Sequence, residues 1–590
     1  MTKHAKKQLG AIVHKTGVKF GVWAPFAKGV SVTGSFNDWQ KTPMEPDGEG
    51  RWFVDVKDAK AGQEYKFAIQ TETDELYRND PRSLAMTTVA GNSVIVDTDF
   101  DWEDDDFTPP PFNEQVIYEM HLGTFYRDDP AVVGSFQTAM EKLSHLHELG
   151  VNMIELMPIN TMAMDRGWGY ASDYIYSVES LYGGRHGLLE FVKAAHKLGI
   201  GVILDVVYNH IGPDEELDLW QFDGWSENNK GGIYFYNDWR SETPWGDTRP
   251  DYGRPEVRQY ILDNVLMWLE ECRLDGLRLD STVYLRNVRG YNNDPDHDIP
   301  EAWLLLQDVN DLAKKVNPKA IMIGEDIAYN EYITRPHSEG GAGFDAQWEV
   351  TFPQILRNAL EVVNDSDRNL TDICSALEKR YNGQSFQRVI YSDSHDSAAN
   401  GAARLSEEIS PGNPSSVFAR KRSLLASAIV LTAPGIPMLF QGQEFMQGGS
   451  FNDWETLDWD KAEQFDGIVL ATKHLIALRK NQHGNTGGLC GPSVRIMHLN
   501  EDSKVLAYHR WGVGGPGDDV MVIINLANTK HNDYWLNFPR HGVWTARFCS
   551  DWEGYDPDFK NITTEQVHVE GEGGSLPLAP YSVTILSQDS

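Results

Sequence analysis

Apolar and polar residues alternate at both ends of this 590-residue chain. In residues 1–108 the alternation is clear over 18–23, and Pro46-Asp47-Gly48 marks a turn. A period of two is typical of half-buried strands, so we expect an N-terminal antiparallel β-sandwich. Alternation returns in residues 486–590, for example over 520–525, and predicts a C-terminal all-β domain.

The middle of the chain, residues 109–485, has a different rhythm, in which short apolar runs alternate with helical patterns. Helices are expected at 135–149 and 188–198. Eight such units favour a closed parallel (β/α)8 TIM barrel over an open doubly wound sheet, which places the chain in the α/β class. The expected strands lie near 116–121, 151–158, 201–205, 276–280, 320–325, 344–348, 388–391 and 436–440.

Two segments stand outside this rhythm. An acidic run at 103–106 and three prolines at 109–111 suit a semi-rigid linker, which sets the first domain boundary. The segment 211–252 is longer than a βα connection needs and carries four tryptophans. Long insertions in compact domains are usually lids or binding loops, so we expect this one to border the active-site cleft.

The net charge of −35 excludes some classes of partner. Such a chain would repel phosphate backbones and anionic membranes, so neither nucleic acid nor a membrane is expected as a partner. The charge indicates a well-solvated surface, and a monomer is the favoured state.

Cysteine usage and the start of the chain predict a cytoplasmic protein. The four cysteines are far apart in the sequence, and no CxxC pair occurs, which indicates free thiols and gives no zinc-ligand spacing. The basic residues 1–7 precede no apolar signal region, and no apolar run reaches the roughly 18 residues of a membrane span. No cofactor or metal is predicted.

Candidate chemistry gathers at the C-terminal ends of four expected strands. Arg278 and Asp280 are two residues apart, so in a strand they point to one face, and the cation favours an ionised, nucleophilic carboxylate. A purely structural ion pair is the alternative. Comparable groups end three other strands, and repeated placement at strand ends is how a TIM barrel builds its active site. These groups are Asp205-Asn209-His210, Glu325-Asp326 and His395-Asp396.

Two of these carboxylates predict retaining glycosidic chemistry. Glu325 follows an apolar run and precedes Asp326, so burial and like charge should raise its pKa and keep it protonated as a general acid. Asp280 should stay ionised. A carboxylate that attacks the anomeric carbon and an acid that protonates the leaving oxygen are what this chemistry needs. Asp396, beside His395, would supply a third carboxylate that supports the cationic transition state.

These four stretches resemble the four signature regions of the α-amylase superfamily, glycoside hydrolase family 13. The resemblance implies that Asp280 is the nucleophile, Glu325 the acid/base and Asp396 the transition-state stabiliser. Trp168-Gly169-Tyr170 is similar to the stretch whose tyrosine stacks under the sugar at the cleavage point, although simple packing is the alternative for this tyrosine. The implied substrate-binding residues are Tyr170, Asp205, His210, Arg278 and His395.

The whole chain resembles the glycogen branching enzymes and their relatives, and residues 1–108 resemble a family 48 carbohydrate-binding module. The resemblance implies a 1,4-α-glucan branching enzyme that acts on glucan polysaccharides or maltooligosaccharides. Ser397-Ala398-Ala399 and Thr243-Pro244-Trp245-Gly246-Asp247 depart from the branching-enzyme pattern. A maltooligosyltrehalose trehalohydrolase, a debranching or amylase-type hydrolase, and a non-catalytic glucan-binding scaffold therefore stay open.

Two further expectations concern ions and acceptors. The residues after Asp280 lack the Lys-His pair of calcium-dependent amylases, so no calcium is expected, although Asn209 could serve as a ligand. Trp239, Trp245 and Trp454 are candidates for a surface that positions the acceptor sugar. Packing that anchors long loops is the alternative for each tryptophan.

Overall fold

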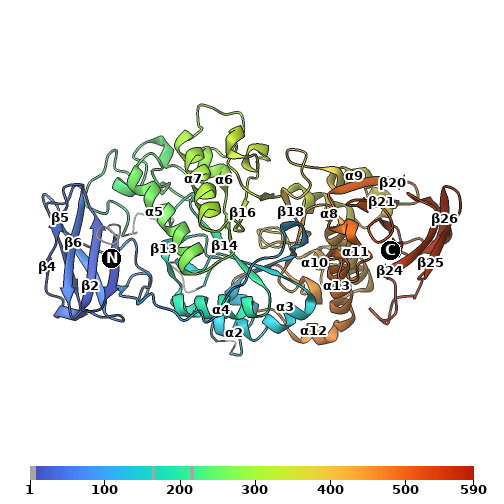
Figure 1. The fold of residues 1–590 in the computed structure, drawn as a ribbon, viewed down its shortest axis with the longest axis horizontal. Coiled ribbons are helices and arrows are strands. Elements are labelled where there is room, and N and C mark those ends of the chain that lie inside the picture. Colours follow the sequence, from blue (N-terminus) through green and yellow to red (C-terminus); the bar gives the residue numbers. More distant parts are fainter. Residues whose placement is uncertain (1–7, 130, 163–165, 213–217, 590) are drawn as a thin grey trace.

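The computed structural model describes residues 8–129, 131–162, 166–212 and 218–589, and the molecule is elongated, with three parts in chain order along its length (Figure 1). The basic start at 1–7 and residues 213–217 of the long insertion lie outside the described residues. An N-terminal pair of sheets stands at one end, an all-β domain stands at the other, and a barrel lies between them.

The central part is a closed barrel of eight parallel strands, which confirms the predicted TIM barrel. Neighbouring strands follow the order of the sequence, and the first strand pairs with the last to close the ring. The strands are β10 (Ile117–Met120), β11 (Met153–Leu156), β14 (Gly201–Val206), β15 (Gly276–Leu279), β16 (Ile321–Gly324), β17 (Ala346–Trp348), β18 (Arg388–Ile390) and β19 (Ile436–Phe440).

The period-two pattern of the strands divides the barrel interior into two layers. The first inward-facing positions are apolar and form one buried cluster that includes Ile117, Met153, Ile203 and Ile323. Each of these apolar residues is followed, two positions later, by a buried carboxylate. The four carboxylates are Glu119, Glu155, Asp205 and Glu325, of which Glu325 lies just after the end of its strand. The floor of the barrel is therefore apolar, and its C-terminal layer is charged.

The shell of helices agrees with the predicted pattern, with one difference. The helix expected at 135–149 is two helices, α2 (Phe136–Met140) and α3 (Leu143–Leu149). Gly150 ends α3 with φ 100°, a left-handed conformation in which glycine costs least. The other helices are α1 (Leu122–Phe125), α4 (Gly184–Lys197), α5 (Pro255–Leu266), α6 (Thr282–Arg286), α7 (Pro300–Val316), α8 (Thr351–Glu361), α9 (Leu370–Glu378), α10 (Leu405–Ile409), α11 (Val417–Thr432), α12 (Asp460–Gln464) and α13 (Asp466–Arg479).

The N-terminal part consists of two antiparallel sheets, as the alternation predicted. One sheet has the order β1-β2-β6-β5, and the other has the order β4-β3-β7-β8 with β9 beside β7. Inward residues of both sheets, such as Phe20 and Phe67, are fully buried. The strands are β1 (Gly10–His14), β2 (Gly17–Trp23), β3 (Gly29–Gly34), β4 (Thr42–Pro43), β5 (Glu45–Pro46), β6 (Arg51–Lys57), β7 (Glu64–Gln70), β8 (Glu75–Arg78) and β9 (Ser93–Val94).

The N-terminal sheets pack directly on the long insertion of the barrel. Phe26 stacks on Trp225 with ring centroids 4.6 Å apart, and Trp23 meets Tyr234 edge to face at 5.4 Å. One continuous apolar cluster runs from these sheets into the shell of the barrel. The insertion is therefore held against the barrel partly by the N-terminal part, which acts as more than a tethered module.

The C-terminal part is all-β, as predicted. A six-stranded sheet of order β20-β21-β22-β27-β24-β25 faces the pair β23-β26, and a second apolar cluster around Trp544 lies between them. A further pair, β12 (Asn160–Met162) and β13 (Ser172–Val178), belongs to the barrel loops. The C-terminal strands are β20 (Ser493–Asn500), β21 (Val505–Trp511), β22 (Val520–Asn525), β23 (His531–Asn537), β24 (Gly542–Cys549), β25 (Gln566–Val569), β26 (Gly573–Leu578) and β27 (Ser582–Ser587).

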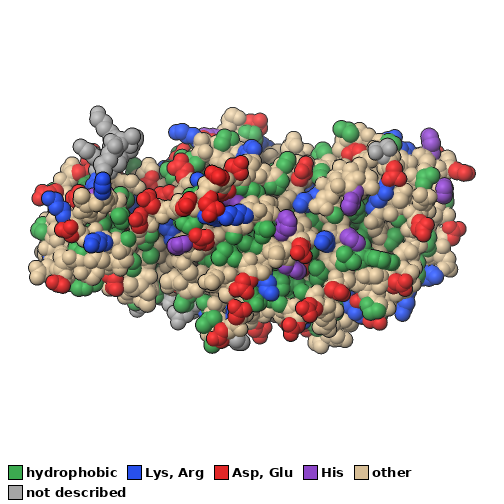
Figure 2. Space-filling model, turned by 60° about the horizontal axis from the view of Figure 1, so that its bottom comes forward, with side chains coloured by type: hydrophobic (Ala, Val, Ile, Leu, Met, Phe, Trp, Pro, Cys, Tyr) green, Lys and Arg blue, Asp and Glu red, His purple; other side chains and the backbone are tan. Residues whose placement is uncertain are grey.

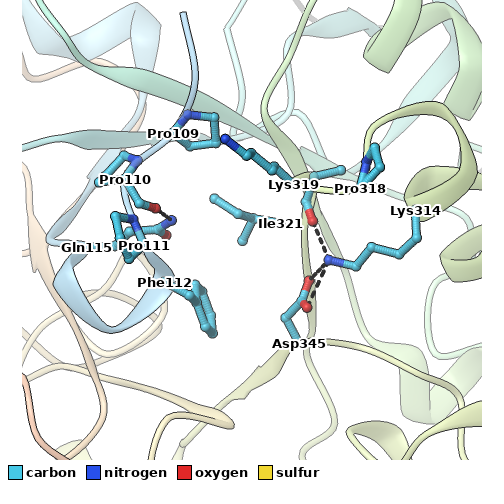
Figure 3. A pocket seen from close by; sticks show the side chains of 11 residues that line it. Pro109, Pro110, Pro111, Phe112, Gln115, Lys314, Pro318, Lys319, Ile321 and Asp345 are labelled. Atoms are coloured by element: carbon cyan, nitrogen blue, oxygen red, sulfur yellow. Dashed lines mark hydrogen bonds and ion pairs between the residues drawn. The ribbon is translucent and has the colours of Figure 1, made fainter.

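The proline joint lies at the bottom of the barrel, beside the start of β16 (Figure 3). Residues 109–112 line a cavity of about 320 Å³ there together with Ile321. On the opposite wall, Lys314 Nζ donates to Asp345 Oδ2 at 2.7 Å. This cavity is at the end of the barrel opposite the charged layer, and none of the ionisable groups at the C-terminal ends of the strands lines it.

Acidic side chains are spread over the face of the molecule drawn in Figure 2, with cationic ones between them. This distribution matches the well-solvated surface expected from the net charge of −35. Among the residues that the structure describes, no helix combines the length and the apolar character needed to cross a membrane.

Candidate active site

Arg278 is the centre of the charged layer. It is fully buried on β15, and its guanidinium contacts carboxylates from three adjacent positions in the barrel. Nη1 donates to Asp205 Oδ2 at 2.6 Å and to Asp280 Oδ1 at 3.0 Å. Nη2 lies 3.0 Å from Glu325 Oε2. The expected pair of Arg278 with Asp280 is therefore present, and it is part of a larger ion network.

Trp348, from β17, supports this cation from one side. The guanidinium carbon of Arg278 lies 4.4 Å from the centre of the indole ring. A buried cation is tolerated where carboxylates and an aromatic face replace its hydration. Trp348 thus holds the Arg278 side chain in the plane where it can bridge several acids.

Asp280 lies just beyond the end of β15, where a second group holds its carboxylate. Asn209 Nδ2 donates to Asp280 Oδ2 at 2.8 Å, so each carboxylate oxygen has one donor. Burial raises the pKa of Asp280 to about 6, and the nearby charge of Arg278 only partly offsets this. Arg278 acts on this pKa in the expected direction, towards the ionised form, but burial outweighs it. Above pH 6 the carboxylate is still mainly ionised.

Both polar atoms of the Asn209 side-chain amide form hydrogen bonds. Its nitrogen bonds Asp280, and its Oδ1 accepts from His210 Nδ1 at 2.5 Å. Within the described ranges, no group of three or more His, Cys, Asp or Glu is arranged to hold a metal ion. Asn209 thus acts as a hydrogen-bond donor to the carboxylate of Asp280.

Glu325 lies just beyond the end of β16, beside Asp280. Burial raises its pKa to about 7, Arg278 lowers it, and the charges of Asp280 and Asp396 raise it further. Asp326, the neighbour expected to raise this pKa, instead receives a hydrogen bond from Arg286 Nε at 2.8 Å. The predicted direction of the shift and burial as its main cause are thus confirmed, but the like charges belong to Asp280 and Asp396 and not to Asp326.

The backbone at Ser281 contributes to the site. Ser281 has φ 43°, in the left-handed region that non-glycine residues seldom adopt. In this conformation its N–H donates to Glu325 Oε2 at 2.9 Å. The turn that follows Asp280 therefore also fixes the carboxylate of Glu325.

His395 and Asp396 follow β18 and lie on the other side of the site. His395 is buried, and its Nδ1 lies 2.5 Å from Glu119 Oε1, while its backbone N–H donates to Glu119 Oε2 at 3.1 Å. Burial lowers the pKa of His395, but the charges of Asp396 and Glu119 outweigh this and raise it to about 10. Asp396 is half-exposed, with Oδ1 3.4 Å from His395 Nε2. The imidazole is therefore a cation, and the Asp396 carboxylate faces open space.

Tyr170 and His210 form the walls of the site. Tyr170 donates from its hydroxyl to Asp205 Oδ2 at 2.6 Å, and its ring stacks on His395 at 5.1 Å. Gly169 has φ 91°, and a side chain there would collide with the backbone oxygen of Pro158, so glycine is required next to Tyr170.

Burial lowers the pKa of His210 to about 4, so it is neutral. Trp245, from the insertion, stacks on the His210 ring at 4.6 Å. This contact places the insertion at the edge of the site, as predicted. Trp239 lines a separate groove further out, and Trp454 is 58% exposed.

Sequence reasoning gave no site role to three residues that the structure brings into the charged layer: Glu119, Glu155 and Trp348. Glu119 anchors His395. Burial raises the pKa of Glu155, and one of its oxygens has no hydrogen-bond partner in the structure as described. The period-two count along β10 and β11 would have found both glutamates, because each follows an inward apolar residue by two positions.

Comparisons with known proteins agree with this geometry. The catalytic domain of the alpha amylase family matches residues 120–240 and 218–469, carbohydrate-binding module 48 (isoamylase N-terminal domain) matches 8–83, and the alpha amylase C-terminal all-beta domain matches 496–589.

Similar relatives include the 1,4-alpha-glucan branching enzyme GlgB of Oceanobacillus iheyensis, with 30% identity over 91% of this chain and 86% of that protein. Another is the malto-oligosyltrehalose trehalohydrolase of Saccharolobus solfataricus, with 30% identity over 75% of this chain and 76% of that protein. Among solved structures, a mutant pullulanase of Paenibacillus barengoltzii complexed with maltotetraose superposes with a TM-score of 0.78 at 20% identity, over 99% of this chain and 95% of that one. The structural match supports the fold alone.

Proposed function

The chain belongs to the α-amylase family, and from this premise we propose that it is a retaining α-glucan-active enzyme, a 1,4-α-glucan branching enzyme. The observation that carries the proposal is the bridging of Asp280 and Glu325 by the two terminal nitrogens of Arg278. One guanidinium holds both carboxylates close together. Close carboxylates favour direct attack on the sugar, whereas inverting enzymes leave room for a water between theirs.

In the proposed first step, Asp280 attacks the anomeric carbon of an α-1,4-linked glucose. The bond from this carbon to the glycosidic oxygen breaks, and the oxygen takes the proton of Glu325. The two hydrogen bonds to Asp280, from Arg278 and Asn209, aim its oxygens before the reaction. With a pKa of about 6 for Asp280 and about 7 for Glu325, the pair can hold one proton between them near pH 6.5.

In the proposed second step, Glu325 acts as a base. It removes the proton from a 6-hydroxyl of a second glucan chain, the oxygen attacks the anomeric carbon, and Asp280 leaves as a carboxylate. The product has an α-1,6 branch, and the number of reducing ends is unchanged. Glu325 is regenerated in its protonated form.

Asp396, His395 and Tyr170 are proposed to hold the sugar at the reacting centre. Asp396 presents a negative charge to the site, which suits a cationic transition state. His395 carries a positive charge and can donate to sugar hydroxyls, and its stack with Tyr170 makes one wall. Glu119 is a positioning residue that acts through His395.

A hydrolase that acts on maltooligosyltrehalose is the second candidate. This candidate is favoured by the similarity to a trehalohydrolase. The sequence identity to that protein is 30%, the same as to one of the branching enzymes, but the match covers less of this chain. The two candidates differ in the acceptor, a sugar hydroxyl or water, and in the substrate, a glucan chain or maltooligosyltrehalose. The relatives that match over more than 90% of this chain include several branching enzymes, which supports transfer to a sugar.

The experiment that tests the proposal is incubation of the pure protein with amylose while iodine staining and reducing ends are followed together. Branching lowers the staining with little gain of reducing ends. Hydrolysis raises the reducing ends in step with the loss of staining. A protein that changes neither would contradict branching and amylase-type hydrolysis, and would leave a hydrolase specific for maltooligosyltrehalose or for α-1,6 branches and the glucan-binding scaffold.

We also propose the cytoplasm as the compartment. Cys272, Cys374, Cys490 and Cys549 all lie within the described residues, and none of them is in a disulfide. Free thiols suit a reducing environment.

A further inference from the structure

Glu155 is a buried carboxyl group that the proposed mechanism does not use. It lies on β11, two positions after the inward-facing Met153, so its side chain points into the barrel, and it is only 1% exposed. Each of the other four acids of the charged layer pairs with Arg278 or His395. In the part of the chain that the structure describes, no cation pairs with Glu155 in this way.

The charges of the layer disfavour a further anion at this position. Glu155 lies directly beside Glu119 of β10 in the register of the barrel, and β14, on its other side, carries Asp205. The layer combines five buried carboxyl groups with two cations, Arg278 and His395. Burial raises the pKa of Glu155 well above its usual value, and the charges of Asp205 and Glu119 raise it further. The two cations offset this only in part.

A neutral Glu155 carries an O–H group that needs an acceptor. Among the described residues, Glu155 Oε2 has no hydrogen-bond partner, and neither has Asp205 Oδ1 on the neighbouring strand. Buried polar groups in proteins are nearly always hydrogen-bonded, either to the protein or to an ordered water. Asp205 uses its other oxygen for Arg278 and Tyr170, so a donor on Glu155 and the open oxygen of Asp205 match each other. Two ionised carboxylates would both be acceptors and could not match.

We propose that Glu155 works as a neutral carboxylic acid and that its O–H donates to Asp205 Oδ1, directly or through one buried water. Asp205 in turn holds Arg278, the cation that bridges Asp280 and Glu325. Glu155 is thus a positioning residue that acts through Asp205 on the catalytic carboxylates. Its effect on activity rests on the proposed function, whereas its protonation can be tested without a substrate.

Protonation is tested by infrared difference spectroscopy of the wild type against Glu155→Gln at about pH 8. A protonated carboxyl group has a C=O band apart from the bands of carboxylates, and the position of this band shifts when the O–H donates a hydrogen bond. Glu325, with a pKa of about 7, is mainly ionised at this pH and is present in both proteins. We expect the band of a hydrogen-bonded acid in the wild type and its loss in the variant. No difference, or a band at the position of an acid without a hydrogen bond, would overturn the proposal.

Activity then separates the neutral donor from the shape of the side chain. Glutamine keeps the shape, the neutrality and a donor, whereas methionine keeps only the length. In Glu155→Met we expect kcat on amylose to fall by about 10- to 100-fold while KM changes by less than about threefold, because the reacting groups are misplaced. In Glu155→Gln we expect kcat to fall by less than about threefold. Equal losses in the two variants, or a methionine variant as active as the wild type, would overturn the proposal.

Folding of the variants also bears on the result. A Glu155→Gln protein that does not fold would overturn the neutral acid, because glutamine is the substitution that such an acid should tolerate best. If Glu155→Met does not fold, the position of the infrared band decides whether Glu155 is a donor. A wild type that acts on no α-glucan would refute the proposed function, and the infrared spectra would still decide the protonation of Glu155.

Discussion

Replacing Glu325 by glutamine should separate leaving groups that need a proton from those that do not. The pKa of Glu325 is about 7, and the protonated form is the active one in the first step. For the wild type on maltooligosaccharides, kcat/KM should therefore fall as pH rises, by about tenfold for each pH unit above 7. Glutamine has no proton to give at any pH. We expect a loss of about 10² to 10⁴ in kcat/KM on these substrates, with no alkaline limb.

The assay compares maltooligosaccharides with α-maltosyl fluoride across pH 5 to 9. Fluoride leaves without protonation, and kcat/KM reports only the first step. We expect Glu325→Gln to keep kcat/KM on the fluoride within about tenfold of the wild type. Equal losses on both substrates, or an alkaline limb near pH 7 that persists in the glutamine variant, would refute the assignment of Glu325 as the acid.

Other changes test the remaining parts of the account. Asp280→Asn should reduce kcat by a factor on the order of 10⁴ or more while circular dichroism stays that of the wild type, and normal turnover by a clean preparation would refute the nucleophile. Glu119→Gln should lower kcat/KM by about 10- to 100-fold, and the loss should deepen as pH rises because His395 can then lose its proton; a loss that is the same at every pH would point to a merely structural role. His196 bonds Asp105 and Asp275 at 2.9 and 3.0 Å, and although burial lowers its pKa, these carboxylates raise it above the usual value. The stabilising effect of protonated His196 is then complete below the unfolded pKa of about 6.5 and is lost as pH rises through the folded pKa. His196→Gln should therefore lower the free energy of unfolding by about 2 kcal/mol at pH 6 and by less at pH 9. Urea titrations that show an equal loss at both pH values would contradict this.

The barrel could be predicted because its strands carry a strong local pattern. Short β-branched runs that end in ionisable residues recur at regular intervals, and all eight expected strands are present in the structure. The break between α2 and α3 was missed because both halves continue the same apolar face across Glu141 and Lys142. Local sequence carries only a weak signal for such a break.

The parts of the site that were missed depend on contacts between distant segments. Glu119 and His395 are 276 positions apart, and only closure of the barrel brings them within 2.5 Å. For Asp280 the sequence shows the charged neighbour that lowers its pKa but not the burial that raises it. In the same way, the sequence places Asp326 next to Glu325, but the structure turns it towards Arg286.

The most direct test of the central claim is the count of linkages in the product. Amylose treated with the wild type should show α-1,6 anomeric signals by proton NMR, and their number should exceed the newly formed reducing ends several-fold. That result would show that Asp280 passes its sugar to a hydroxyl of a second chain. One new reducing end for each bond cut, with no α-1,6 signal, would contradict the account and assign the chain to hydrolysis.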